Sequence, residues 1–239
     1  MLQPQQPTPS FLRSRLRDVP FVFLLFLVLV LSIALVLMTL GNSSEQAPRG
    51  NVRVDFYGES LCPDCRHMVL DVLKPIMDQG LGSFIDLRYI AYGNVRKTND
   101  GSTQCQHGEM ECLYNKYINC AQEMNSDAWF GYVACMAEDL GTLRGSNGDS
   151  RAEKCAQDNG LSAVKVKECA TGKRGDALEK LAGSETDGLV PKHTFVPWIV
   201  VNGVAIGNDF ENLDRYICAA LDGDLPEACF NMRPSIMHQ

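Results

Sequence analysis

The sequence has no run of basic residues, and acidic side chains outnumber basic ones. Lysine and arginine total 22 against 29 aspartate and glutamate residues, so the net charge is −7. Residues 1–41 hold three of the basic and one of the acidic residues, which leaves 19 against 28 and a net charge of −9 over residues 42–239. Proteins that bind nucleic acid present a basic patch to the phosphates. The composition therefore argues against nucleic acid as a partner.

The sequence also lacks an internal repeat and a second Cys-x-x-Cys motif. A structural zinc module needs two pairs of ligands at matched spacing. The nearest candidates to pair with Cys62 and Cys65 are Cys105, His107 and Cys112, and their spacing does not form a second pair. A zinc module is therefore disfavoured, and we predict neither a bound metal nor an organic cofactor.

One long apolar run is present near the N-terminus. Phe21–Leu40 contains 20 residues without a charge, which matches the hydrocarbon core of a bilayer, and it follows a Pro/Gln-rich segment, 1–20, with three arginines. The arginines predict that residues 1–20 stay cytosolic. We interpret the run as a signal anchor, with a signal peptide cleaved near residues 39–41 as the alternative. Both interpretations deliver residues 42–239, including a glycosylation sequon at Asn42, into the secretory pathway.

Ten cysteines support the same placement, because disulfides persist in oxidising compartments and are rare in the cytosol. The last residues do not form a retrieval signal of the Lys-Asp-Glu-Leu type, so we expect transport beyond the endoplasmic reticulum. The lysosome or vacuole, the cell surface and secretion all remain open as destinations.

The pattern of apolar residues predicts a β-α-β unit at the start of the lumenal part. Residues 52–60 and 84–93 read as strands, and residues 63–80 between them have apolar side chains at helical spacing. Pro75 falls inside this helix and is expected to kink it or to interrupt its bonding. The order strand, helix, strand favours a parallel pair of strands.

The rest of the chain completes an α/β domain over residues 51–222, followed by a tail, 223–239. Residues 94–190 form a helical insert that holds six of the ten cysteines. Residues 194–206 predict a hairpin closed by an Asn-Gly turn, and residues 210–221 a closing helix. The predicted order is therefore β-α-β, then a helical insert, then β-β-α.

Cys62-Pro63-Asp64-Cys65 stands at the predicted start of a helix. Proline is favoured at the first helical position, so Cys62 becomes the N-cap, with its sulfur facing unpaired N–H groups and the positive end of the helix dipole. Such settings lower the pKa of a thiol from about 8.5 to about 3.5–7.5. We predict that Cys62 is the nucleophile and that Cys65 resolves the mixed disulfide. The Asp64 carboxylate should repel the thiolate and make the pair more reducing than a motif with His there.

Pro197 begins a strand late in the chain. A residue inside a sheet normally donates its backbone N–H to a neighbouring strand, and proline has no N–H to donate. A cis Val196–Pro197 bond would explain this placement and would leave backbone beside the dithiol for a substrate strand. Trp198, the next residue, either packs in the core or borders that groove. His67, one turn into the predicted helix, either modulates Cys65 or is solvated.

The stretch CQHGEMECLYNKYINC, residues 105–120, resembles the signature of the gamma-interferon-inducible lysosomal thiol reductase family, C-Q-H-G-x2-E-C-x2-N-x4-C. With the dithiol at the first strand-to-helix junction and a proline opposite, residues 51–222 also resemble the thioredoxin superfamily. The resemblance implies a thioredoxin-like fold with a helical, cysteine-rich insertion. Every fixed position of the signature matches: Cys105, Gln106, His107, Gly108, Glu111, Cys112, Asn115 and Cys120.

The same resemblance implies an enzyme that reduces protein disulfides in an acidic lumen, with Cys62 attacking and Cys65 resolving. Its partners would be disulfide-containing proteins and a small-thiol or dithiol reductant that restores the pair. Two alternatives remain open: a disulfide oxidase or isomerase on the same fold, and a redox-silent binding module in which Cys62 and Cys65 form a structural bridge.

The roles of the other cysteines and of His107 are less determined by sequence. On a continuous helix Cys105 and Cys112 would lie about 10 Å apart, too far for a disulfide, unless Gly108 opens the helix. Cys218 and Cys229 are the best candidates for a local bridge. We interpret His107 as positioning the insert through hydrogen bonds, with proton carrier or ligand as the alternative.

Overall fold

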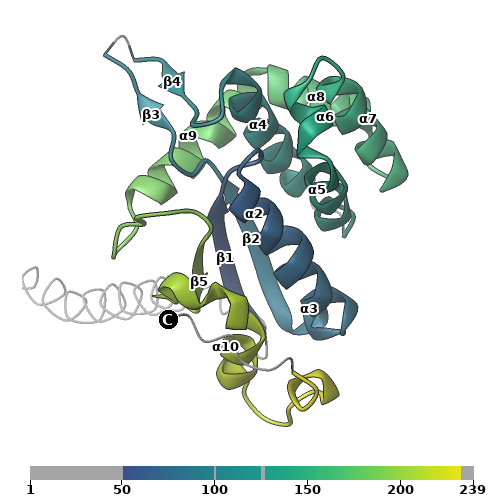
Figure 1. Ribbon diagram of the computed structural model, residues 1–239, viewed down its shortest axis with the longest axis vertical. Coiled ribbons are helices and arrows are strands. Elements are labelled where there is room, and N and C mark those ends of the chain that lie inside the picture. The colour runs from purple at the N-terminus through teal and green to yellow at the C-terminus, as the bar shows by residue number, and fades with distance from the viewer. Residues whose placement is uncertain (1–50, 100, 125–126, 233–239) are drawn as a thin grey trace, which may run out of the picture. The chain divides into compact units, whose positions relative to one another are not determined.

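The chain divides into two compact units, Met1–Arg49 and Gly50–Gln239, and only the second contains residues that the structure describes. In the computed structural model these are residues 51–99, 101–124 and 127–232, drawn in colour in Figure 1. The predicted anchor at 21–40 and the sequon at Asn42 lie outside these ranges and stay predictions. Within the described ranges, no helix has the length and apolar character needed to cross a membrane.

A sheet in the order β2-β1-β5-β6 forms the centre of the domain. Strand β1, Val52–Gly58, pairs in parallel with β2, Ile85–Ala91, and antiparallel with β5, Trp198–Val201. Strand β6, Val204–Ala205, extends the sheet beyond β5. The predicted parallel pair is confirmed, and β1 lies between two neighbours with all but one of its side chains buried.

The predicted Asn-Gly hairpin joins β5 to β6. Asn202 and Gly203 have φ angles of 46° and 82°, and two positive values are typical of the type I′ turn that matches the twist of a hairpin. Asn202 also accepts the backbone N–H of Arg53 through its side-chain oxygen, at 2.9 Å. The turn is therefore fixed both by its local sequence and by the first residues of β1.

The helix after β1 changes its bonding pattern along its length. It begins as α2, Pro63–His67, continues as a π-helix over Met68–Leu73, and ends as α3, Lys74–Asp78. Pro75 has no N–H, and its ring would collide with the carbonyl four residues earlier. The turn before it widens, so the first amide of α3 donates to the carbonyl of Val69, five residues back. The predicted interruption of the helix is confirmed.

The insert is helical, as predicted, but it opens with a small hairpin that the sequence did not predict. Strands β3, Arg96–Lys97, and β4, Thr103–Gln104, are two residues long and exposed, so they carry no apolar alternation to reveal them. Figure 1 shows the next helices grouped at the end of the sheet where β1 meets α2. The helices of the insert are α4 Glu109–Glu123, α5 Trp129–Glu138, α6 Leu140–Arg144, α7 Gly148–Asp158, α8 Ala163–Thr171 and α9 Lys173–Asp187.

The closing helix is shorter than predicted. A 3-10 segment, Gly207–Asn212, precedes α10, Leu213–Ala220, although the predicted helix began at residue 210. The Asp209 carboxylate accepts hydrogen bonds from the side chains of Asn212 and Tyr216, both at 2.6 Å. Asp209 lies at φ −89° and ψ 18°, outside the helical region, so the side-chain bonds take the place of a regular helical turn.

Both faces of the sheet are buried. Val54 and Phe56 belong to the larger core, with the helix after β1 and most of the insert, whereas Tyr57 and Trp198 belong to a smaller cluster on the other face. Trp198 is 6% exposed and packs edge-on against Phe195. Trp198 therefore packs in the core. Two shorter 3-10 segments complete the described elements, Leu81–Phe84 and Glu227–Cys229.

Disulfides link eight of the cysteines: Cys105–Cys112, Cys120–Cys169, Cys135–Cys155 and Cys218–Cys229. The predicted local bridge between Cys218 and Cys229 is confirmed. Cys105 and Cys112 also pair, with their Cα atoms 5.6 Å apart, because Gly108 at φ 94° lies before the first helical residue of α4 and leaves Cys105 outside the helix. Gly108 thus opens the helix, which is the condition under which the sequence allows Cys105 and Cys112 to pair.

Candidate active site

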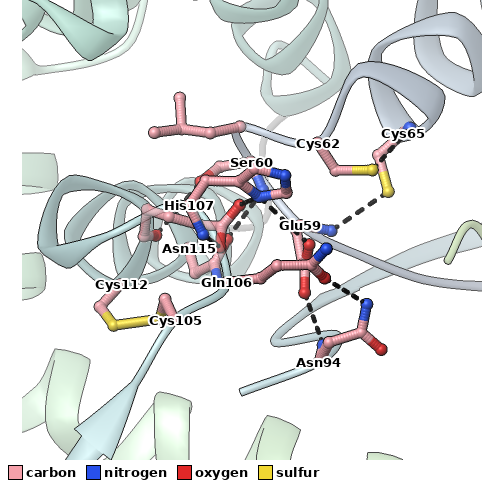
Figure 2. Close-up of polar contacts among 12 residues, drawn as sticks. Glu59, Ser60, Cys62, Cys65, Asn94, Cys105, Gln106, His107, Cys112 and Asn115 are labelled. Atoms are coloured by element: carbon pink, nitrogen blue, oxygen red, sulfur yellow. Dashed lines mark hydrogen bonds and ion pairs between the residues drawn. A yellow bond between two sulfur atoms is a disulfide. The ribbon is translucent and has the colours of Figure 1, made fainter. Parts of the chain in front are cut away.

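Cys62 and Cys65 are the cysteines of the described chain that form no disulfide. Cys62 has extended backbone angles and caps α2, and its sulfur accepts the N–H of Cys65 at 3.4 Å (Figure 2). Pro63 occupies the start of the helix, as the sequence predicts. Cys62 is 6% exposed and Cys65 only 1%, so the outer sulfur belongs to Cys62 and the inner one to Cys65.

The two thiols differ in acidity. The hydrogen bond from the Cys65 thiol lowers the pKa of Cys62 to about 7, against the opposing effect of burial, and the backbone N–H groups of Cys65 and Asp64 add to the lowering. The carboxylate of Asp64 raises the pKa of Cys62, which is the direction that the sequence predicts for it. Burial, and the hydrogen bond to Cys62, raise the pKa of Cys65 far above the ordinary value of a thiol. One thiolate therefore forms first, and it is on Cys62.

The residue that joins the strand to this site is Glu59, which the sequence analysis did not identify. Its backbone N–H donates to the sulfur of Cys65 at 3.3 Å, and its carboxylate accepts the N–H of Asn94 at 2.6 Å. Burial, and then the charge of Glu111, raise the pKa of Glu59 to about 7. The sequence did contain a signal for Glu59: it is a charged residue between a buried strand and the dithiol.

Glu59 and Cys65 line one small cavity of about 10 Å³. That volume is about the space that the centre of one water molecule requires. The contact from Glu59 to the inner thiol is made by its backbone N–H, whereas its carboxylate faces Asn94 and His107.

The polar residues of the signature lie beside the loop between β1 and α2 (Figure 2). Asn115 accepts the backbone N–H of Ser60 at 2.9 Å, and the Ser60 hydroxyl donates to the carbonyl of Glu111 at 3.2 Å. Gln106 accepts a hydrogen bond from the side chain of Asn94 at 2.7 Å. The structure therefore brings these signature residues to the dithiol loop, whereas the signature cysteines form the bridges given above.

His107 lies between two buried carboxylates. Its backbone N–H and its Nδ1 atom contact Glu111 at 2.9 and 2.5 Å, and Nδ1 lies 3.5 Å from an oxygen of Glu59. The imidazole is 22% exposed, and both carboxylates are fully enclosed. These contacts agree with the interpretation that His107 positions the insert through hydrogen bonds.

Pro197 and His67 are the two other residues that the sequence predicts near the site. The Val196–Pro197 peptide bond is cis, and the pairing of Tyr57 with Trp198 puts Pro197 level with the end of β1, from which the dithiol loop leaves. A second cis bond, Val190–Pro191, was not predicted. His67 bonds to Asp71 and Glu211 on its two ring nitrogens, so it ties α2 to the 3-10 segment before α10.

The sequence of this chain is similar to those of known thiol reductases. A family described as gamma interferon inducible lysosomal thiol reductase (GILT) matches residues 53–159. The mouse gamma-interferon-inducible lysosomal thiol reductase is 31% identical over 79% of this chain and 75% of its own length. A gamma-interferon-responsive lysosomal thiol protein of Arabidopsis thaliana is 28% identical over 82% of each chain. A GILT-like protein of Caenorhabditis elegans is 32% identical, but the chain spans only 58% of that relative.

Solved structures show the fold. BdbD from Bacillus subtilis superposes with a TM-score of 0.57 at 14% identity, covering 74% of this chain and 91% of that one. DsbA from Mycobacterium tuberculosis superposes with a TM-score of 0.53 at 20% identity, covering 75% and 88%. The predicted thioredoxin-like α/β fold with a helical insertion is confirmed.

Proposed function

The chain belongs to the gamma-interferon-inducible lysosomal thiol reductase family of disulfide oxidoreductases, and we propose that it reduces protein disulfides through Cys62 and Cys65. The observation that carries this proposal is the asymmetry of the pair. Cys62 is the outer sulfur, with a pKa of about 7, whereas Cys65 is buried, with a raised pKa. A nucleophile and a resolving thiol need these two different environments.

In the first step the Cys62 thiolate attacks one sulfur of a substrate disulfide. The substrate S–S bond breaks, a mixed disulfide forms on Cys62, and the other substrate sulfur leaves as a thiolate that takes up a proton. The N–H of Cys65, which contacts Cys62 Sγ at 3.4 Å, stabilises the thiolate before the attack. Val196 and Pro197 supply the strand end along which the substrate backbone lies in this proposal.

In the second step Cys65 loses its proton and attacks the sulfur of Cys62. The mixed disulfide breaks, the second substrate thiol leaves, and Cys62 and Cys65 become joined. Two electrons have then passed from the dithiol to the substrate. A small thiol or a dithiol protein returns two electrons and restores the pair.

The pKa of Cys62 indicates that the chain reduces substrate disulfides and does not form them. A nucleophilic cysteine with a pKa near 7 is typical of thioredoxin, whose potential is about −270 mV, whereas the strong oxidant DsbA has a pKa of about 3.5. The pKa of Cys62 is about 7. We therefore place the chain with the reductases, and the oxidase or isomerase becomes the alternative.

The proposed location is the lumen of the secretory pathway, with an acidic compartment as the working site. The four disulfides of the described chain support folding in an oxidising compartment. At acidic pH an ordinary thiol carries almost no thiolate, and a lowered pKa keeps a usable fraction on Cys62.

Turnover of a disulfide-bonded protein substrate at pH 5 and pH 7 tests this function in the full-length chain. We expect Cys62→Ser to abolish turnover and Cys65→Ser to accumulate a mixed disulfide that is visible by mass spectrometry. Wild-type protein whose Cys62–Cys65 pair resists millimolar glutathione and turns over no substrate would instead be a disulfide-stapled binding module. A reduction potential less negative than about −180 mV would favour the isomerase or oxidase.

A further inference from the structure

Three potential metal ligands converge beside the dithiol. Glu59, His107 and Glu111 each contribute one oxygen or nitrogen atom, and these atoms all lie within 4.8 Å of one another. Glu59 follows β1, His107 precedes α4, and Glu111 lies in the first turn of α4. The fold therefore builds the cluster from two segments that are distant in the sequence, and neither Cys62 nor Cys65 belongs to it.

One of these atoms has no hydrogen-bond partner. The side chain of Glu59 is fully enclosed, and its Oε2 atom accepts no hydrogen bond from the described residues. The same Oε2 lies 3.5 Å from Nδ1 of His107, so it points into the cluster. A buried carboxylate oxygen without a donor is unfavourable, and bound metal ions are one of the few partners that satisfy such an atom.

The charges of the cluster are also unbalanced. In the described part of the chain, the ion pairs of Glu59 and Glu111 involve only His107, and no lysine or arginine reaches either carboxylate. When both carboxylates are ionised they carry two negative charges, which for Glu59 requires a pH above its pKa of about 7. A divalent cation would balance both charges, whereas a protonated His107 balances only one.

From this geometry we propose that Glu59, His107 and Glu111 bind a divalent transition-metal ion, with Zn²⁺ as the representative. Imidazole nitrogen and carboxylate oxygen are ligands that Zn²⁺ accepts at about 2.0–2.2 Å, and three protein ligands leave a further position for water. The 3.5 Å between His107 Nδ1 and Glu59 Oε2 is close to the spacing of two ligands on one such ion. Binding at Nδ1 replaces the hydrogen bond between His107 and Glu111, and a neutral imidazole then carries its one proton on Nε2.

This site differs from the zinc module that the sequence argued against, because it uses no cysteine. The prediction of no metal rested on the absence of a second cysteine pair and did not consider Glu59. In this proposal His107 and Glu111 of the signature coordinate a metal ion, in addition to positioning the insert. Metal binding here does not depend on turnover, so it can fail while the proposed reductase function stands.

Binding of Zn²⁺ to the oxidised full-length chain tests the proposal. Oxidation joins Cys62 to Cys65 and so removes their thiolates, which would otherwise bind the ion. Competition with a chromophoric chelator measures the affinity, and the Zn²⁺-dependent rise in the thermal unfolding midpoint provides a second readout. We expect stoichiometric binding by the wild-type chain, and binding weakened by at least about tenfold in Glu59→Gln and in His107→Asn.

The control is His67→Asn. His67 also contacts two carboxylates, but through opposite ring nitrogens, so its partners Asp71 and Glu211 cannot converge on one ion. Its replacement should leave Zn²⁺ binding unchanged. Glu59→Gln keeps a side-chain oxygen that accepts the N–H of Asn94, so this variant should fold. If His107→Asn fails to fold, the binding measured for Glu59→Gln decides the test.

Three outcomes would overturn the proposal. The first is a wild-type chain that neither competes with the chelator nor gains thermal stability with Zn²⁺. The second is equal binding by wild type and Glu59→Gln. The third is binding that is lost in His67→Asn, which would place the ion elsewhere. A Co²⁺ spectrum of the oxidised chain with d–d bands and no thiolate charge-transfer band would support coordination by nitrogen and oxygen.

Discussion

The backbone N–H of Glu59 donates to the sulfur of Cys65 at 3.3 Å, while the side chain of the same Glu59 faces His107. One residue thus connects the inner thiol to the polar residues of the signature. The neighbouring Ser60 is held by Asn115 and by the carbonyl of Glu111. Hydrogen bonds therefore join the dithiol loop to the start of α4, although the two segments are far apart in the sequence.

The first prediction concerns the acidity of Cys62. Its pKa of about 7 predicts that the alkylation rate of the reduced chain rises through a midpoint near pH 7. At pH 5 about one hundredth of Cys62 would be thiolate, roughly a hundredfold more than for a thiol with a pKa of 9. Stopped-flow alkylation with iodoacetamide across pH 4–10 would measure the midpoint.

The matched variant for that measurement is Cys65→Ala. The hydrogen bond from the Cys65 thiol is the main cause of the lowered pKa of Cys62, so the midpoint should move toward higher pH when this thiol is removed. A wild-type midpoint near pH 9, or the same midpoint in both proteins, would contradict the assignment of Cys62 as the activated thiol.

The second prediction concerns Asp64. Its carboxylate raises the pKa of Cys62, so Asp64→Asn should lower that pKa, stabilise the reduced pair and make the reduction potential less negative. A full pKa unit corresponds to about 30 mV for this two-electron couple, and we expect a shift smaller than that because other groups dominate. Equilibration with glutathione measures the potential.

Asp78→Asn is the control for Asp64→Asn. Asp78 ends α3, pairs with Lys74 and is exposed, so its removal should leave the potential unchanged. A more negative potential in Asp64→Asn would mean that the backbone or packing at position 64, and not its charge, sets the balance between the two forms.

The third prediction concerns the support of the dithiol loop. Asn115 is 2% exposed, and its side chain accepts the backbone N–H of Ser60. Asn115→Ala leaves that donor without its partner, which should lower the free energy of unfolding by about 1–3 kcal/mol. Urea denaturation of the oxidised chain measures the loss. Ser83→Ala, which removes an exposed hydrogen bond to Gly80, should change it by less than about 0.5 kcal/mol.

Local rules were enough to predict the sheet and the position of the dithiol. Pro63 fixes the helix start and makes Cys62 its cap, and the Asn-Gly pair closes the hairpin between β5 and β6. Both effects depend on residues that are adjacent in the chain, so a sequence pattern contains them.

Contacts between distant segments were not predictable in the same way. The meeting of Glu59 with His107 and Glu111 depends on how α4 docks against the end of β1. The hairpin β3–β4 is exposed and has no apolar alternation, so its sequence resembles that of a loop. The disulfides Cys120–Cys169 and Cys135–Cys155 depend on helix packing, and the spacing of their cysteines did not assign them.

The last prediction compares two disulfides that close loops of different length. Cys120–Cys169 spans 49 residues and joins α4 to α8, whereas Cys218–Cys229 spans 11 residues. If the bridges act mainly by restricting the unfolded chain, the longer loop should contribute about 1.3 kcal/mol more stability. Replacing each pair by alanine and comparing the urea unfolding free energies measures this difference. An equal or larger loss for the Cys218–Cys229 pair would mean that native packing around the bridges, and not loop length, determines what they contribute.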